Sequence, residues 1–228
     1  MFQGFTQETS SFLWELSFHN ERPWFLEHKE QFERCLNEPF KVLAAETAAH
    51  MRERFPQREW RVHCSRIYRD ARRLFGRGPY KDHLWFTVWT DEIGRGNGPA
   101  FWFEIGPATW ECGVGFFEST PAAMETFRRM IDANPARFER LAEELSRMRG
   151  LRILGPEYKR PKGHREGPIA AWYNRRWLAV EWVHDFGGDL LTPELPEKLA
   201  KNFARLMPLY EFFLEVFLAA SEASEEGR

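Results

Sequence analysis

The stretch LWFTVWTDEIGRGNGPAFWFEIGPATWECGV, from Leu84 to Val114, decides the fold class because it repeats the composition of a β-strand. Aromatic and β-branched residues favour a pleated backbone, and they fill three runs: residues 84–90, 101–105 and 110–114. Gly106-Pro107 predicts a tight hairpin between the last two runs, and residues 91–99 predict a flexible loop between the first two. Connections this short favour antiparallel pairing.

Helical patterns flank these strands on both sides. Before them, apolar spacing predicts a helix over residues 7–18 and another from Pro23 to about Pro56, with Asn20 as a cap ahead of the second. After them, a capping residue precedes a proline at the start of three further predicted helices: Thr120-Pro121, Asn134-Pro135 and Thr192-Pro193. Shorter elements are also expected: strands over 61–68 and 177–183, and a loop with a short strand over 150–168.

The order helices, strands, helices predicts an α+β fold, in which an antiparallel sheet of aromatic-rich strands is covered by helices from both ends of the chain. No internal repeat or linker interrupts the 228 residues, so a single domain over 1–228 is expected, with a frayed tail at 218–228. An aromatic content of 16% excludes a disordered chain, which would be poor in such residues.

Composition and charge restrict the environment and the partners of the protein. The formal net charge is −2, so no global field draws the chain to nucleic acid or to a membrane surface. The three cysteines, Cys35, Cys64 and Cys112, have no metal or redox spacing, and we interpret them as reduced, which is typical of a cytoplasmic protein. No metal or cofactor is predicted, and no apolar run approaches the roughly 20 residues that span a bilayer.

A second stretch, SRIYRDARRLFGRGPYKDH from Ser65 to His83, holds five arginines and a lysine but only two aspartates. Clustered guanidinium groups repel each other, so they need an anion between them, either from the protein or from a ligand. The ligand interpretation assigns anion binding to Arg66, Arg69, Arg72, Arg77 and Lys81. The alternative is an internal salt-bridge network with Asp70, Asp82 and more distant glutamates.

Another basic segment, Lys159 to Arg165, lies in a loop rich in glycine and proline. One interpretation is a solvated surface loop. The other is that Lys162 and His164 join the first basic stretch and line a positively charged cleft with it.

These residues resemble the family known as domain of unknown function 2461. The segment Asn20–Phe25 matches its Asn-Arg-x-Trp-Phe opening with one extra residue, and Lys29 matches the lysine that follows. Its central motif is matched by Ser65–Asp70, Arg72 and Pro79-Tyr80-Lys81, and its later loop by Pro161-Lys162-Gly163. The resemblance covers residues 4–217 and implies the fold and the place of a site rather than a reaction. Where the family reads Phe-Ser-x-Asp-Lys, this chain has Arg73 to Arg77, which implies a more positive site.

The residues support more than one function. The first hypothesis is recognition of a phosphorylated or carboxylated small molecule, and whether the protein is also an enzyme stays open. Tyr80 or His83 would then donate a proton, and Asp70 would orient an arginine or act as a base. The alternatives are a nucleic-acid-binding module, suggested by basic residues interleaved with Tyr68, Tyr80, Phe75 and nearby tryptophans, and an adaptor that docks an acidic protein partner through the same loop.

Overall fold

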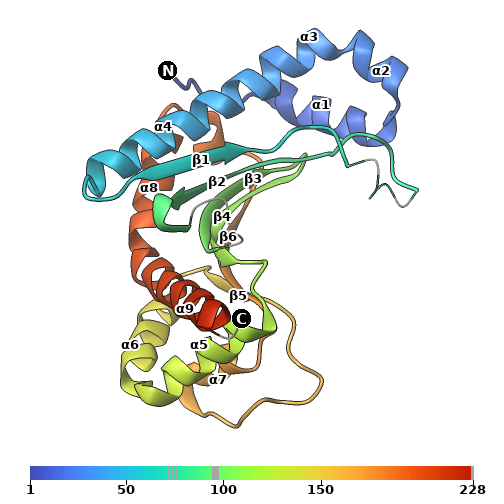
Figure 1. The fold of residues 1–228 in the computed structure, drawn as a ribbon. Helices are drawn as coiled ribbons and strands as arrows, with labels where there is room; N and C mark the ends of the chain where they lie inside the picture. Colours follow the sequence, from blue (N-terminus) through green and yellow to red (C-terminus); the bar gives the residue numbers. More distant parts are fainter. Residues whose placement is uncertain (71, 73, 75, 94–97, 227–228) are drawn as a thin grey trace. The chain divides into compact units, whose positions relative to one another are not determined.

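The computed structural model describes residues 1–70, 72, 74, 76–93 and 98–226, and Figure 1 traces the chain through them. Two compact units are formed. Unit 1 contains Met1–Val88, Trp102–Cys112 and Val183–Asn202, and unit 2 contains Trp89–Phe101, Gly113–Trp182 and Phe203–Arg228. Each unit therefore combines segments that are far apart in the sequence, and each is described here by itself.

The predicted α+β class is confirmed, with an antiparallel six-stranded sheet and helices at both ends of the chain. In the described residues the strands follow the order β1-β2-β3-β4-β6-β5. Their bounds are β1 Trp60–Cys64, β2 Leu84–Thr90, β3 Ala100–Ile105, β4 Thr109–Phe116, β5 Arg152–Leu154 and β6 Leu178–Asp185. The hairpin at Gly106-Pro107 forms as predicted, and the Gly106 amide donates to the Thr109 carbonyl at 2.9 Å across the turn.

Unit 1 places α4 along β1 (Figure 1). Its N-terminal helices are α1 Gln7–Phe18, α2 Arg22–Glu27, α3 Lys29–Phe32, the π-helix η1 Glu33–Asn37 and α4 Glu38–Arg54. Phe40 on α4 contacts Phe86 on β2, with ring centroids 5.6 Å apart, and Phe86 stacks on Phe103 of β3 at 5.2 Å. The aromatic residues of the strands therefore form core, as their composition suggests.

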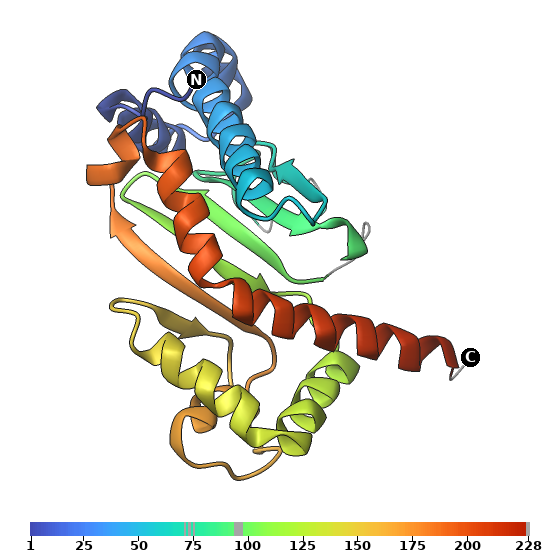
Figure 2. The ribbon, with the colours of Figure 1, turned by 90° about the vertical axis from the view of Figure 1, so that its left-hand side faces the viewer.

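Unit 2 holds the helices that follow the hairpin, and Figure 2 shows α5 beside α9. The helices are α5 Pro121–Ala133, α6 Pro135–Ser146, the short η4 Gly167–Ile169 and α7 Ala170–Tyr173, and α9 Met207–Glu226. Two of the three predicted caps are confirmed, since the side chains of Thr120 and Asn134 accept hydrogen bonds from backbone amides in the first turns of α5 and α6. The helix expected directly after Thr192 begins at Leu195 instead. Phe127 and Phe138 pack edge to face in the core of this unit.

Several sequence predictions are wrong in detail. The strand expected over 61–68 ends at Cys64, and the single last helix is two, α8 Leu195–Arg205 and α9, with Pro208 in the first turn of α9. Residues 218–226 form the last part of α9, and fraying of this tail stays a prediction. The cap of α2 is Glu21 instead of Asn20, whose side chain binds elsewhere. The short helices η3 Asp91–Ile93 and η5 Gly188–Leu191 were not expected.

No helix among the described residues combines the length and the apolar character that crossing a membrane requires.

Candidate functional site

The basic stretch Ser65–His83 lies in unit 1, where its two arms run back against each other. Tyr68 and Tyr80 form an antiparallel bridge. Flanking backbone bonds of 2.8 Å run from the Arg69 amide to the Pro79 carbonyl and from the Lys81 amide to the Ile67 carbonyl. Backbone pairing therefore brings Arg66 and Arg69 close to Lys81. No local sequence pattern predicts this pairing.

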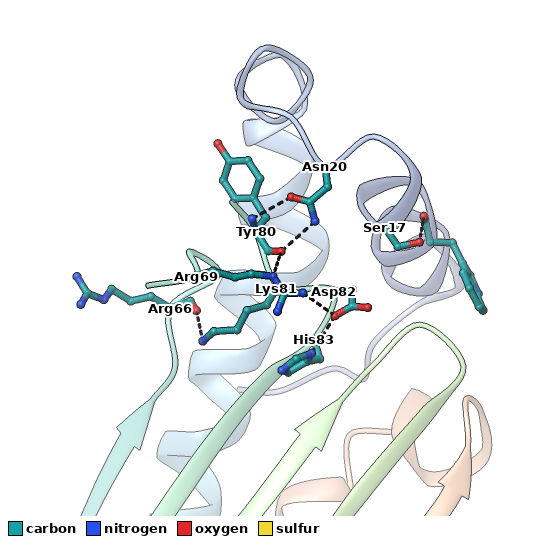
Figure 3. A network of polar contacts seen from close by, with 9 residues as sticks. Ser17, Asn20, Arg66, Arg69, Tyr80, Lys81, Asp82 and His83 are labelled. Atoms are coloured by element: carbon teal, nitrogen blue, oxygen red, sulfur yellow. Dashed lines mark hydrogen bonds and ion pairs between the residues drawn. The ribbon is translucent and has the colours of Figure 1, made fainter. Parts of the chain in front are cut away.

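Asn20 holds this pairing in place from the N-terminal helices (Figure 3). Its side-chain oxygen accepts from the Tyr80 amide and its nitrogen donates to the Tyr80 carbonyl, both at 2.9 Å. A Cβ at Gly78 would lie 2.3 Å from the Asn20 side-chain oxygen, so only glycine fits there. The side-chain amide of Asn20 thus holds the loop instead of capping a helix, because the backbone N–H and C=O of Tyr80 both need hydrogen-bond partners.

Two of the predicted anion-binding arginines already have partners inside the protein. Arg69 donates from Nε to the Tyr80 carbonyl at 2.7 Å and from Nη2 to Asp82 at 3.5 Å. Arg72 pairs with Asp70 through Nη2 at 2.8 Å and Nε at 3.1 Å. Each guanidinium is neutralised at least in part by a nearby acid, which is the salt-bridge alternative that the sequence left open.

The other cations of this stretch are less compensated. Arg66 and Arg77 are exposed, and neither guanidinium has a partner among the described residues. Lys81 donates to the Arg66 carbonyl at 2.7 Å (Figure 3), and its pKa is lowered, first by burial and then by Arg69 and Arg66. Arg73 and Phe75, which the sequence analysis also named, lie outside the described residues.

The three predicted catalytic residues have different surroundings. Tyr80 is buried, its ring stacks on Phe25 at 4.1 Å, and burial raises the pKa of its hydroxyl. His83 lies 3.0 Å from Asp82, so a carboxylate can orient its ring for proton transfer. Asp70 is bound to Arg72 and is poorly placed to act as a free base. Catalytic roles for these residues stay predictions.

The second basic loop belongs to unit 2 and is held firmly by Asn174. The Asn174 side chain accepts a hydrogen bond from the Lys162 amide at 2.7 Å and donates one to the Gly163 carbonyl at 3.0 Å. The main-chain carbonyl of Asn174 accepts a further bond from the Tyr158 amide at 2.9 Å. His164 points to solvent beside Glu166, at 3.6 Å. The loop therefore presents Lys162 in a defined place, whereas His164 lies on the surface.

This loop forms one wall of a cavity of about 540 Å³ in unit 2. The N-terminal part of α5 forms another wall, since Pro121, Glu125 and Arg128 follow the i, i+4, i+7 spacing of one helix face. The remaining lining residues are Ser119, Pro156, Tyr158, Lys162, Arg176 and Trp177. Three cations and a single acid thus surround the cavity.

Arg128 is the unusual member of this lining, because it is charged and only 4% exposed. Its Nη2 donates to Glu125 at 2.9 Å, and its guanidinium lies 5.5 Å from the centre of the Tyr158 ring. Nε and Nη1 are buried without a hydrogen-bond partner among the described residues. Leaving a buried donor unpaired costs about 1–3 kcal/mol, and more for a charged group, so this side chain is poised for an acceptor from outside.

Further donors border the cavity without partners of their own among the residues described. The Lys162 amine lies 5.0 Å from the Tyr158 ring centre, and no carboxylate binds it. The Arg176 guanidinium and the Tyr158 hydroxyl are likewise unpaired, although the Arg176 amide is tied to the Pro156 carbonyl at 2.9 Å. The amino end of α5, which has no acidic residue in its first turn, adds positive partial charge.

Of the residues that line this cavity, Lys162 alone was predicted from the sequence as a binding residue. A signal for Arg128 was present, because it shares an apolar helix face with Met124 and Ile131 at i−4 and i+3. A cation in the middle of an apolar stripe needs a partner that the helix does not supply. The basic loop at 159–165 can be recognised in the sequence by its local charge. The cavity cannot, because it depends on one buried charge and on packing between distant segments.

The loop wall is also held by an ion pair that predicts a pH effect. Asp132 on α5 pairs with Arg165 and accepts a 2.7 Å hydrogen bond from the Tyr173 hydroxyl. Burial opposes ionisation of Asp132, but the hydrogen bonds from Arg165 and Tyr173 prevail and lower its pKa below the ordinary 3.8. Its contribution to stability is therefore complete above pH 3.8 and is lost as the pH falls through the lower folded-state pKa.

Replacing Asp132 by asparagine is accordingly expected to lower the free energy of unfolding at neutral pH by about 1 kcal/mol, allowing for solvent screening. The difference from wild type should begin to shrink as the pH falls below 3.8 and should vanish at the lower pH where the carboxylate of the folded wild type also becomes neutral. Urea unfolding at several pH values measures this, with exposed Asp185→Asn as the matched loss of a carboxylate. A difference that persists unchanged at low pH would show that the charge of Asp132 is irrelevant.

Comparison with known proteins agrees with the resemblance seen in the sequence. The model of the family described as "Conserved hypothetical protein (DUF2461)" matches residues 8–212. A search of curated proteins found no match to the chain.

Proposed function

The chain belongs to the DUF2461 family of conserved hypothetical proteins, and we propose that it binds a small molecule bearing a phosphate or a carboxylate in the cavity beside α5. The observation that carries this proposal is Arg128, a buried cation that lines the cavity and has two guanidinium nitrogens without a hydrogen-bond partner among the described residues. Such an arrangement is costly in the empty protein and favourable once an anion arrives.

The charge balance of the cavity supports the same proposal. Among the lining residues, Arg128, Lys162 and Arg176 meet one carboxylate, that of Glu125, which is 62% exposed, and Asp132 on the same helix also interacts electrostatically with Arg128. The amino end of a helix of 13 residues adds to the positive potential. An anion in this place would meet charge from side chains and from backbone dipoles together.

Preorganisation is a further support. The loop that carries Tyr158 and Lys162 is pinned to Asn174 through backbone and side-chain hydrogen bonds. An anion would therefore bind without first ordering this segment, so less conformational entropy opposes binding.

The basic stretch of unit 1 supports a second candidate. Neither Arg66 nor Lys81 forms an ion pair with a carboxylate among the residues described, although Glu104 partly compensates the charge of Lys81. Nucleic acid and an acidic protein partner remain alternatives for this exposed surface. Nucleic-acid binding there should weaken steeply with salt, so titration with an oligonucleotide at low and at moderate salt separates it from small-molecule binding.

Calorimetric titration with inorganic phosphate and with citrate tests the main proposal. Wild type should bind at millimolar concentration or below, and Lys162→Ala and Arg176→Ala should each weaken binding about tenfold, since each removes a charged partner worth about 1.4 kcal/mol. Both residues are exposed, so neither change should impair folding.

The matched controls are Lys159→Ala and Arg160→Ala, which remove the same charges from exposed positions of the same loop that do not line the cavity. They should leave the affinity within about twofold of wild type. Equal losses in all four variants would indicate general electrostatic attraction, and no saturable binding of either anion would contradict the proposal.

A further inference from the structure

The cavity beside α5 is much larger than an inorganic anion requires. Its volume of about 540 Å³ lies within the range of about 300–1,000 Å³ that is usual for sites of small organic ligands. An inorganic phosphate has only five heavy atoms and would occupy a small part of this space. A ligand that fills this space would carry an organic body next to its anionic group.

The uncharged part of the lining indicates what this body is. Four of the lining side chains are rings: Pro121, Pro156, Tyr158 and Trp177. Rings of this kind offer flat apolar surfaces, on which planar groups pack with little loss of conformational freedom. A flat ring system suits these walls better than a flexible sugar or an aliphatic acid.

Trp177 is held in a fixed position at the cavity. Its ring lies 5.4 Å from that of Phe117, at an angle of 45°. A Cβ at Gly155 would lie only 1.9 Å from the Trp177 carbonyl, so the backbone passes close behind it and glycine is required there. The close backbone approach fixes the position of the Trp177 main chain, and the Phe117 ring supports the indole, which can therefore offer a stacking surface to a ligand.

The ionic part of the lining favours a phosphate over a carboxylate. Arg128, Lys162 and Arg176 outnumber Glu125, and the helix end adds further positive potential. A phosphate monoester carries a charge of about −1.5 to −2 and three terminal oxygens at neutral pH. A carboxylate has one charge and two oxygens, so it would leave more of these donors unpaired.

We infer that the cavity takes the phosphate monoester of a flat aromatic compound, with the phosphate at Arg128 and the amino end of α5 and the ring against Trp177. The inference rests on the proposed function and specifies the class of ligand for the same site. No chemical step is implied, because the lining explains binding and orientation of such a compound without one.

Calorimetric titration with four probes tests the inference: inorganic phosphate, glycerol phosphate, phenyl phosphate and benzoate. Phenyl phosphate should bind about tenfold or more tightly than glycerol phosphate, which has the same charge but no ring. Phenyl phosphate should also bind more tightly than benzoate, which has the ring but not the phosphate. Trp177→Leu should lower the affinity for phenyl phosphate to about that for glycerol phosphate. It should leave the affinity for inorganic phosphate within about twofold of wild type.

Trp14→Leu is the matched control, because Trp14 is an exposed tryptophan outside the cavity lining, and it should change none of the affinities. Equal affinity for phenyl and glycerol phosphate would overturn the aromatic class while the proposed anion site stands. Benzoate binding more tightly than phenyl phosphate would overturn the phosphate assignment alone. Absence of binding by all four probes would overturn both the inference and the proposed function.

Discussion

Replacing Arg128 by methionine is expected to reduce phosphate binding at least 100-fold, with stability equal to that of wild type or higher. Methionine is similar in length and fills the buried space without a charge. The loss of binding follows because a buried guanidinium forms charge-assisted hydrogen bonds, and two of them are worth about 3 kcal/mol or more. This is the largest functional effect that the structure predicts.

The expected stability follows from the surroundings of Arg128. Replacing a buried charge by a well-packed apolar side chain is often neutral, or stabilising by about 1–4 kcal/mol. The partner that is left behind, Glu125, is 62% exposed and can be hydrated by water. The cation–π contact with Tyr158 is lost, at a cost of about 0.5–2 kcal/mol, which offsets part of the gain.

Calorimetry for binding and urea unfolding for stability separate the two effects. Arg129→Met is the matched control on the same helix, since Arg129 is exposed and bonds only to Thr126 among the residues described. It should bind phosphate as wild type does. Strong destabilisation by Arg128→Met would instead show that the buried arginine serves the fold, and retained binding would refute its role in the site.

Tyr80→Ala should have the largest effect on stability, a loss of about 3–5 kcal/mol, which is usual for truncating a buried aromatic side chain. Tyr80 is 2% exposed, and its ring stacks on Phe25 and contacts Tyr68 at 5.3 Å. Its removal would open a cavity beneath the loop that Asn20 clamps. Urea unfolding measures the loss of stability.

Tyr80→Phe separates the ring from the hydroxyl. The hydroxyl has no hydrogen-bond partner among the residues described, so this variant should remain within about 0.5 kcal/mol of wild type. Tyr68→Ala, at an exposed neighbour, should cost clearly less than Tyr80→Ala. A large loss of stability in Tyr80→Phe would mean that the hydroxyl itself is required, and it would support a functional role for this group.

Local signals account for the elements that were predicted correctly. The strands at 84–90 and 101–105 follow from side-chain shape, and the caps at Thr120 and Asn134 follow from side chains that reach backbone amides three residues away. The break before α9 also had a local signal, because Pro208 cannot donate a helical hydrogen bond. It was missed because the apolar stripe continues across the break.

The predicted anion site shows where local reasoning ends. The sequence located Arg66, Arg69, Arg72 and Lys81 in one stretch, but the partners of these residues depend on backbone pairing and on Asp70 and Asp82. Whether a cation is neutralised depends on groups within a few ångströms, and electrostatic interaction falls off with distance in space and not with separation along the chain.

The sequence by itself therefore determined the α+β class, the hairpin, the caps at Thr120 and Asn134 and the place of two basic segments, since each depends on neighbouring residues. Only the tertiary structure decided which cations remain without a partner and that Arg128 is buried at the wall of a cavity. That cavity is assembled from residues 119–128, 156–162 and 176–177, and burial and charge compensation arise only when the folded chain brings such distant segments together.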